Sequence, residues 1–567
     1  MQGDALDASE EVLYNFNTLA VHENFMALVN ENQGVGGDVP FVIPAGNPGN
    51  GSCNDIAWTA AFPLITHDLF SYYGDLRVVE RRWPSLVLYI ENLIAHASGT
   101  PAKLAECDQF QDWLCGNSMS CCANTGNTTA PLSCPVPKEM GAFNYVLALQ
   151  AMSQMAKALG KGNDMTRYAA LADAARQSFH AVFYNEVAGT YGNDFGAVQS
   201  LTLPALEIGS PPAELRPHVV QTLQNDLELR TQYHLAVGAV TSKILLNVLS
   251  DNGLRKSAMR VATQTTEPSW GYWWTKNSTT CWEAFPGGGD TRNHIFLCGG
   301  VGEWLWKHAV GLTPTQPGFE AIRIAPELDP DYGPGTLNAT FHSVKGAIHS
   351  SWTLEQSGSH AGSVSMSVDI PLGVQTATIV VPKPFVTSPK PPMPAHQVCG
   401  SASEKEASLT LYCNSDHSSD GAVIDKVEWA AWGTPNLNGG CSEWKANATC
   451  NSNMTGVNSP LAIVSANCTG KPSCVLAFGG GGHSALGDPC PEVVKTLAVR
   501  VHCTTGKGGT ISKPASTATI TEAGKQIWNG KQLVGKPVGI LAARDEPDGV
   551  ALDVVGNSGW AFVSAHA

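Results

Sequence analysis

The chain has 567 residues, 43% of them hydrophobic, and a net charge of -15. This length allows several domains, since one domain usually has about 100–200 residues. The acidity argues against a nucleic-acid partner, because binding to phosphates rests on basic side chains, although it also fits plain solubility. No apolar tract is long enough to cross a membrane. We expect a globular protein that acts on neutral ligands.

The first part of the chain, residues 1–314, has the pattern of a helical domain. Apolar residues recur at helical spacing in segments separated by loops rich in Gly, Pro and Asn. The segments expected to be helical are 4–32, 55–73, 76–97, 138–160, 163–184, 212–228, 233–250, 252–264 and 300–311. Their succession predicts antiparallel helix pairs arranged as a toroid.

The rest of the chain changes character. Residues 315–388 alternate in strand fashion, and a stiff Pro-rich linker follows them. Residues 396–504 are dense in Cys and predict a compact disulfide-rich domain. After a flexible linker, residues 518–567 again read as strands.

Cysteine usage and sequons indicate an oxidising compartment. Of the 16 Cys, 13 cluster in residues 107–134 and 399–503 without zinc spacing, so we expect disulfides and no metal site. N-x-S/T sequons agree with a secreted or extracellular glycoprotein. They begin at Asn50, Asn127, Asn277, Asn338, Asn447, Asn453 and Asn467. The chain opens without a signal-peptide pattern.

The most informative stretch is 267–312, which holds six Trp and a carboxylate, Glu283, directly after one of them. Aromatic rings can stack on the C–H faces of a sugar, polar groups can fix its hydroxyls, and a carboxylate can activate water. The alternative is a Trp-rich helical core in which Glu283 is a solvated surface acid.

This stretch resembles glycoside hydrolase family 78, the α-L-rhamnosidases, in four ordered segments. They read PSWGY from Pro268, TTCWE from Thr279, RNH from Arg292, and GVGEWLWKHAVG from Gly300. Earlier segments agree, namely GDA at 3–5, DVP at 38–40 with IP at 43–44, DIAW at 55–58, YGD at 73–75 and QDW at 111–113. The resemblance covers about 1–390 and implies a multidomain protein in which an (α/α)6 helical barrel is followed by an antiparallel β-sandwich.

Family roles carry over onto matching positions. Glu283 matches the general base of an inverting hydrolysis. Asp4, Trp58, Trp113 and His294 match residues that hold the rhamnose, and Asp112 is a further candidate. The rings of Trp58 and Trp113 could form an apolar surface against the C6 methyl of the sugar, and Asp4 and His294 could bind its hydroxyls. The alternatives are core packing for each Trp and a helix-cap role for His294.

The family's general acid has no match here. It is a Glu in D-x-x-x-R-D-E-R-x-G-W-x-G-D, seven residues before the Asp that Asp4 matches, whereas the chain begins three residues before Asp4. An inverting mechanism needs two carboxylates about 6.5–9.5 Å apart. We expect a truncated N-terminus that carries the acid, and we do not assign the acid's role to Glu10 or Glu11.

The Cys-rich domain resembles a second family, the galactose/rhamnose-binding lectins of the sea-urchin-egg (SUEL) type. The matching segments include LTLYC at 409–413, AWGTP at 431–435, GKPSC at 470–474 and GDPCP at 487–491. The resemblance implies sugar binding by Asp488 and Lys495, with Trp432 at the place of a ring-stacking Tyr. The alternative is a disulfide-stabilised spacer. The tail, 518–567, resembles the closing strands of the family 78 sandwich, which implies that this small α+β lectin domain is inserted in the sandwich.

Three functions remain open at this stage. The first is exo-acting release of terminal α-L-rhamnose from glycosides or polysaccharides, with a galactose or rhamnose ligand at the lectin domain. The second is a non-catalytic carbohydrate-binding protein, and the third is another exo-glycosidase on the same toroid. We expect no cofactor, no nucleic-acid partner and no membrane partner.

Overall fold

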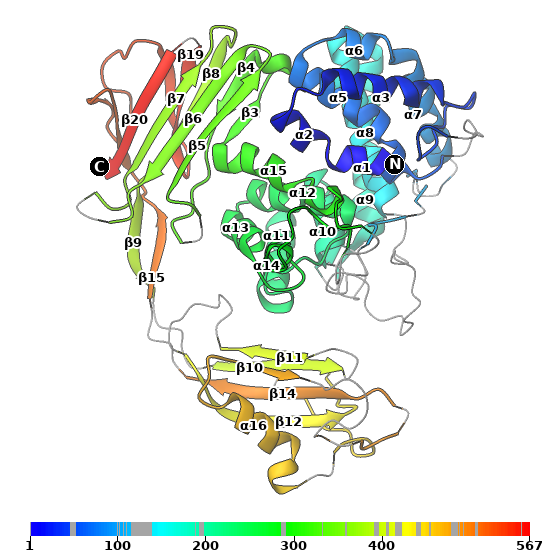
Figure 1. Cartoon of the computed structure of the whole chain (residues 1–567), viewed down its shortest axis with the longest axis vertical. Coiled ribbons are helices and arrows are strands. Elements are labelled where there is room, and N and C mark those ends of the chain that lie inside the picture. Colours follow the sequence, from blue (N-terminus) through cyan, green and yellow to red (C-terminus); the bar gives the residue numbers. More distant parts are fainter. Residues whose placement is uncertain are drawn as a thin grey trace. The chain divides into compact units, whose positions relative to one another are not determined.

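The computed structural model describes residues 2–45, 53–98, 100, 103–105, 107–108, 110–114, 139–186, 189–191, 198–284, 291–331, 333–357, 360–390, 396–403, 408–413, 422–437, 444–452, 455–477, 486, 488–491, 493–504, 509–556 and 558–566. The chain divides into two compact units (Figure 1). The first unit is discontinuous in sequence and combines Met1–Val386 with Pro514–Ala567, and the second is Thr387–Lys513.

The N-terminal part of the first unit is helical. Its α-helices are α1 (Gln2–Asp7), α2 (Ser9–Asn15), α3 (Leu19–Glu31), α4 (Ile56–Thr59), α5 (Ala61–Tyr73), α6 (Arg77–Glu80), α7 (Trp83–Ser98), α8 (Glu139–Ala158), α9 (Gly162–Phe183), α10 (Val198–Glu207), α11 (Arg216–Asn225), α12 (Ala239–Asp251), α13 (Arg255–Thr263), α14 (Trp270–Thr275) and α15 (Val301–Trp304). A π-helical turn, Leu305–Val310, continues α15, and β1 (Tyr184–Asn185) pairs with β2 (Thr190–Tyr191).

Six helical segments form an inner ring. In ring order they are α1 with α2, then α5, α8, α10, α12 and α15, and each contacts the next until α15 meets α2. Helices α8 and α12 are buried on nearly every side, whereas α9 and α13 bury only one stripe. This difference is expected between an inner layer and an outer layer of helices.

The inner helices point the same way. The first turns of α10 and α12 meet at the Asp112 carboxylate, while later turns of all six inner segments line one common cavity. We call the two ends of the ring the first-turn end and the last-turn end. Figure 1 shows these helices gathered on one side of the β-sheets.

Most of the expected helices are present, with several differences. The segment expected to be helical over 4–32 forms the three helices α1, α2 and α3. The helix expected over 233–250 begins only at Ala239, and α10 and α14 were not predicted. Residues 199–206 of α10 are all buried, so this inner helix has no solvent-facing side, and Pro204 lies inside it. Helix α5 ends at Gly74, whose φ of 68° is the left-handed conformation typical of a glycine after a helix.

Two sheets follow the helices. The strands are β3 (Leu312–Pro314), β4 (Ala321–Ile324), β5 (Thr336–Ser343), β6 (Gly346–Leu354), β7 (Val364–Ile370), β8 (Thr376–Pro382), β16 (Ala518–Glu522), β17 (Lys525–Trp528), β18 (Ile540–Asp545), β19 (Gly549–Val555) and β20 (Ser558–His566). One sheet has the order β17-β16-β20-β7-β6-β5, and the other β18-β19-β8-β4-β3. Buried and exposed residues alternate along β7, which confirms the period-two pattern in its sequence.

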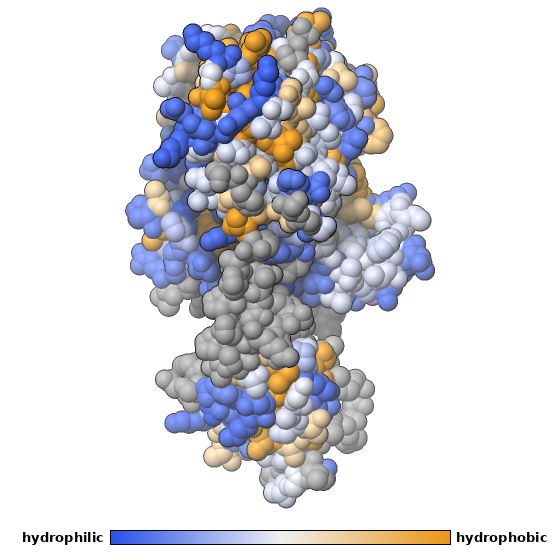
Figure 2. Space-filling view, turned by 90° about the vertical axis from the view of Figure 1, so that its left-hand side faces the viewer, coloured by the Kyte–Doolittle hydropathy of each residue, from blue (hydrophilic) through white to orange (hydrophobic). Residues whose placement is uncertain are grey.

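The last strands of the chain complete both sheets. Strand β20 pairs with β7, and β19 pairs with β8, although the 127 residues of the second unit, Thr387–Lys513, separate the two parts in sequence. The expectation of a purely antiparallel sandwich is wrong at one place, because β4 runs parallel to β8. On the side of the molecule where the sheets lie, Figure 2 shows apolar residues interleaved with polar ones. Leu372, Val538 and Leu541 are among the exposed apolar side chains.

The second unit has its own small core and five described strands in two sheets. These are β10 (His396–Ser403), β14 (Thr496–Cys503) and β12 (Ile424–Gly433) in one sheet, and β11 (Ser408–Tyr412) with β13 (Ser473–Ala477) in the other. One helix, α16 (Pro460–Cys468), packs on β12. The disulfides Cys413–Cys503, Cys450–Cys490 and Cys468–Cys474 close it. The segments that enter and leave this unit, β9 (Phe385–Lys390) and β15 (Gly509–Pro514), pair with each other.

Candidate functional site

A short paired segment carries Glu283 and His294. The Glu283 amide donates to the Thr291 carbonyl at 3.1 Å, and the His294 amide donates to the Cys281 carbonyl at 2.9 Å. A disulfide joins Cys281 to Cys298, so the segment is fixed at both edges. These bonds place the predicted base and the predicted sugar-binding His on adjacent stretches of backbone.

The Glu283 carboxylate is half-buried and accepts no hydrogen bond from the described part of the chain. Its neighbour Trp282 is buried, with the Arg292 guanidinium 4.8 Å from the centre of its ring and the Trp273 ring 5.9 Å away. Trp282 therefore belongs to the core and holds the backbone of Glu283, whose own side chain is half-buried.

Asp4 and His294 form a polar pair that ties α1 to this segment. Nε2 of His294 lies 3.1 Å from Oδ1 of Asp4, and both side chains are about one-quarter exposed. Burial would raise the pKa of Asp4, but the hydrogen bond with His294 and the positive charge of the N-terminal amino group together lower it. Asp4 is therefore an ionised acceptor, which suits binding of a sugar hydroxyl.

Trp58 lies under α1 rather than at an open surface. Only 1% of Trp58 is exposed, and a Cβ on Gly3 would approach its ring to 2.7 Å. The ring packs on Phe110 at 4.9 Å, and Phe110 in turn contacts Trp113 at 5.5 Å and Phe41 at 5.3 Å. Trp113 is half-buried. Trp113 thus fits an apolar wall, while Trp58 supports the residue next to Asp4.

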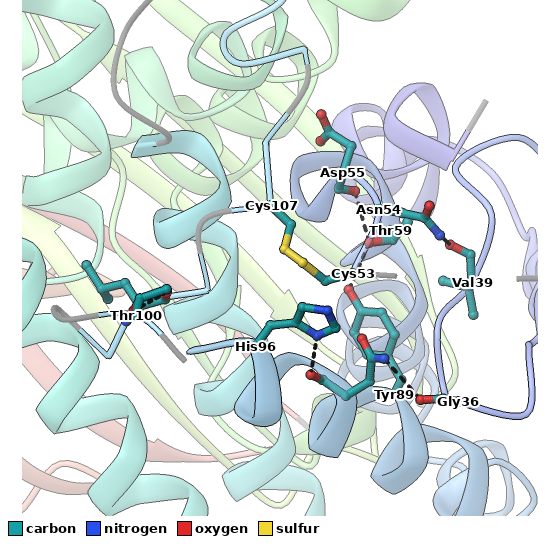
Figure 3. Close-up of a disulfide and its surroundings, with 12 residues drawn as sticks. Gly36, Val39, Cys53, Asn54, Asp55, Thr59, Tyr89, His96, Thr100 and Cys107 are labelled. Atoms are coloured by element: carbon teal, nitrogen blue, oxygen red, sulfur yellow. Dashed lines mark hydrogen bonds between the residues drawn. A yellow bond between two sulfur atoms is a disulfide. The ribbon is translucent and has the colours of Figure 1, made fainter. Parts of the chain in front are cut away.

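The segment that bears Phe110 and Trp113 is fastened to the start of α4 (Figure 3). The disulfide Cys53–Cys107 joins the two stretches, and the Ile56 amide donates to the Cys107 carbonyl at 2.9 Å. Oδ2 of Asp55 accepts from the Phe110 amide at 2.7 Å. The predicted disulfide staple of this loop is thus present, whereas Cys115, Cys121, Cys122 and Cys134 lie outside the described residues.

Asp112 does not fit the sugar-binding role predicted for it. Its buried carboxylate accepts from the Gly238 amide at 2.8 Å, from the Thr241 amide at 3.1 Å, and from the hydroxyls of Ser200 and Thr241. Burial raises its pKa even though these bonds favour the charged form. Because these donors surround it, Asp112 acts as a cap for the first turn of α12.

Sequence reasoning missed Glu139 and Asp7 at the same end. Glu139 is 1% exposed, and neither of its carboxylate oxygens has a hydrogen-bond partner within the described ranges. Burial, together with the charges of Asp108 and Asp112, raises the pKa of Glu139 far above its usual value. Burial also raises the pKa of Asp7 strongly. Burial thus shifts the pKa of both carboxyl groups toward the protonated form, and nothing in their local sequence distinguishes them from surface acids.

In the second unit, the structure brings together two of the three predicted lectin residues. Nζ of Lys495 lies 2.8 Å from Oδ1 of Asp488, and the Asp488 side chain is 52% exposed. Trp432 is 1% exposed and packs in the core of the unit. A ring buried in this way has no free face, so the stacking role predicted for Trp432 does not fit this packing.

Within the described ranges, no group of three or more acidic, His or Cys side chains is placed to hold a metal ion. Of the helices that the structure describes, none combines the length and the hydrophobicity needed to span a bilayer.

A family model for the bacterial alpha-L-rhamnosidase 6 hairpin glycosidase domain matches residues 2–309, more than half of the chain. The chain belongs to this family. The model of the bacterial alpha-L-rhamnosidase C-terminal domain matches residues 311–388. A third model, the D-galactoside/L-rhamnose binding SUEL lectin domain, matches residues 416–503.

Individual relatives agree with this assignment. An alpha-L-rhamnosidase of Streptomyces avermitilis is 30% identical over 329 residues, which are 56% of this chain and 29% of that protein. The solved structure of a Streptomyces avermitilis alpha-L-rhamnosidase complexed with L-rhamnose is 25% identical, with a TM-score of 0.57 over 69% of this chain and 36% of that one.

The structure of alpha-L-rhamnosidase from Dictyoglumus thermophilum gives a TM-score of 0.66 at 18% identity, covering 100% of this chain and 46% of that one, and so shares the fold. The chain thus spans less than half the length of these relatives.

Proposed function

We propose that the first-turn end of the helical ring is the water-activating half of an inverting, exo-acting site that releases terminal α-L-rhamnose. Glu283 is the general base. The observation that carries this proposal is its carboxylate, which is unpaired in the described part of the chain. It is fixed on the segment that also presents His294 to Asp4. The relatives, named as alpha-L-rhamnosidases, support the choice of sugar.

The roles follow from the geometry. Ionised Asp4 accepts a hydrogen bond from a sugar hydroxyl, and His294 binds a neighbouring one. Half-buried Trp113 provides an apolar wall for the C6 methyl. Glu283 takes a proton from a water molecule that attacks the anomeric carbon on the face opposite the departing group.

A substrate with an activated leaving group tests the base without depending on the general acid. The substrate 2,4-dinitrophenyl α-L-rhamnoside releases a phenolate that needs little protonation. We expect the chain to hydrolyse it, and we expect Glu283→Gln to lower kcat by about 10²–10⁴-fold, as is typical for loss of a general base. NMR of the first-formed sugar should show the β-anomer.

The matched control is Glu267→Gln, an exposed acid of the same Trp-rich stretch, which should retain full activity. Equal rates for Glu283→Gln and the unmodified chain would overturn the assignment of the base. A first-formed α-anomer would overturn the inverting mechanism. Activity on other aryl glycosides but not on the rhamnoside would favour a different exo-glycosidase.

For the second unit, we propose a lectin domain inserted in the sandwich that binds rhamnose or galactose near Asp488 and Lys495. The paired strands β9 and β15 at its base support the insertion, because both linkers leave the sandwich side by side. Binding at a second site would raise the local concentration of substrate without changing the chemistry.

We also propose that the protein is secreted and glycosylated. The disulfides of both units and the exposed sequon residues Asn277, Asn338 and Asn467 support this location. A mass shift on treatment of the native protein with peptide N-glycosidase would be the expected result.

A further inference from the structure

The last-turn end of the ring contains a cavity of about 770 Å³. Its volume lies within the range of about 300–1,000 Å³ that is usual for small-molecule sites. All six inner segments contribute to its lining, and Glu10, Gln154 and Asp251 come from three of them. Along α12 the cavity lining begins at Lys243 and ends at Asp251, and Thr241, which binds Asp112 at the first-turn end, is not part of it.

The cavity wall carries more acids than cations. Six Asp and Glu side chains line it, against three Lys and Arg side chains. Nζ of Lys307 lies 2.8 Å from Oε1 of Glu10 and 2.7 Å from Oε1 of Glu303. Lys243 donates to the Leu6 carbonyl at 3.0 Å and lies 3.7 Å from Oε2 of Glu303. The excess of acids disfavours a small anion here.

Three acceptor atoms on the cavity wall have no hydrogen-bond donor within the described ranges, namely Oδ1 of Asn247, Oε2 of Glu303 and Oε2 of Glu327. Asn247 lines the cavity and is only 9% exposed. Its amide nitrogen donates to Oε1 of Glu303 at 2.9 Å, and the same oxygen accepts from Nζ of Lys307 at 2.7 Å. Its Oδ1 has no partner within the described ranges. A buried acceptor without a hydrogen bond destabilises the folded protein, and a hydroxyl group of a ligand could donate the missing bond.

The wall also has an apolar side. Leu6, Leu64, Leu147, Ala151 and Ile244 line the cavity together with the amides of Gln150 and Gln154. Apolar surface opposite a few amide and carboxylate groups suits a molecule that has C–H faces and hydroxyl groups.

We propose that this cavity is a second carbohydrate site, which binds a neutral mono- or disaccharide and is separate from the first-turn end. The proposal does not depend on Glu283. A sugar bound here would stiffen the inner ring from its last-turn end, because it would contact all six inner segments.

A cysteine placed in the cavity gives a local measurement. Ser71 lines the cavity and is half-buried, so Ser71→Cys introduces a thiol with little change in volume. The rate of its alkylation by iodoacetamide in the full chain is measured with L-rhamnose, D-galactose or putrescine. We expect at least one of the sugars to slow alkylation in a saturable manner, and putrescine to have no effect.

Variants in the Ser71→Cys background test the acceptor. Asn247→Leu should weaken sugar protection by about three- to tenfold, which corresponds to one lost hydrogen bond. Gln150→Leu provides a second test should the first variant fold poorly. The matched control is Asn225→Leu on the exposed face of α11, which should leave protection unchanged.

Other outcomes would overturn the proposal. Protection by putrescine but not by sugars would make this a cation site, and absence of protection by all three probes would exclude a small-molecule site. Glu283→Gln in the same background should keep full sugar protection. Loss of protection in that variant would mean that the sugar acts from the first-turn end instead.

Discussion

The two ends of the helical ring use the same kind of side chain in opposite ways. The Trp-rich stretch contains Trp282-Glu283 and Glu303-Trp304, two acids that look alike in sequence. Glu283 is half-buried and unpaired in the described structure, whereas Glu303 is 2% exposed and bound to Lys307 and Asn247. A carboxylate beside a Trp therefore says little about its role until its partners are known.

The strongest test of this contrast removes the lysine at the last-turn end. Lys307→Met leaves Glu10 and Glu303 buried without their shared cation, and breaking a buried ion pair in this way costs about 3–5 kcal/mol. Denaturation in guanidinium chloride, followed by Trp fluorescence, should show this loss in the free energy of unfolding. Lys256→Met is the control, because Lys256 makes a half-exposed ion pair with Asp331 that is worth at most about 1 kcal/mol. An equal loss in the free energy of unfolding in Lys307→Met and Lys256→Met would contradict the expected difference between the buried and the half-exposed ion pairs.

A smaller effect is expected at the first-turn end. Asp112→Ala leaves the amides of Gly238 and Thr241 without their acceptor, which should cost about 1–3 kcal/mol. The same denaturation measurement applies. Asp164→Ala, in the first turn of α9, should change stability by less than about 0.5 kcal/mol, since no side-chain cap is formed there. A negligible change in Asp112→Ala would return Asp112 to the list of sugar-binding candidates.

The smallest effect is a change in pH dependence. Burial and the charge of Glu10 raise the pKa of Glu303 to about 7 from its ordinary value of 4.5. Between these two values the folded chain binds the proton more tightly than the unfolded chain, so stability falls as pH rises through this window. Glu303→Gln should make that fall in Tm shallower.

Glu10 does not contribute to the pH dependence of stability between pH 4.5 and 7. Although burial opposes the shift, Lys307 and Lys243 lower the pKa of Glu10 to about 2, so its stabilising contribution is complete above pH 4.5 and is lost only as pH falls toward 2. An unchanged slope between pH 4.5 and 7 in Glu303→Gln would show that Glu303 is ionised throughout the window.

Local patterns predicted a large part of this molecule. Strands such as β7 alternate because one face is buried, and the outer helices show apolar residues at helical spacing. Glu283, His294 and Asp4 were found through ordered motifs, and the structure brings the last two to 3.1 Å.

The remaining features depend on contacts that no local pattern records. Helix α10 is buried along its length and contains Pro204, and Asp112 caps a helix that begins 127 residues later, at Ala239. The raised pKa of Glu139 follows from burial by distant segments. The cavity is lined by the six inner segments together with residues of β3 and β4, so no local pattern predicts it.

The paired strands β9 and β15 also bear on how the chain is made. Strands β7 and β8 leave the ribosome well before their partners β20 and β19, with about 170 residues between β8 and β19. At a synthesis rate of about 5–20 residues per second, the edges of β7 and β8 therefore remain without their partner strands for a time on the order of 10 s. The disulfide-rich unit is synthesised before the closing strands β19 and β20. Pairing of β9 with β15 would then bring these strands close to the edges of β8 and β7.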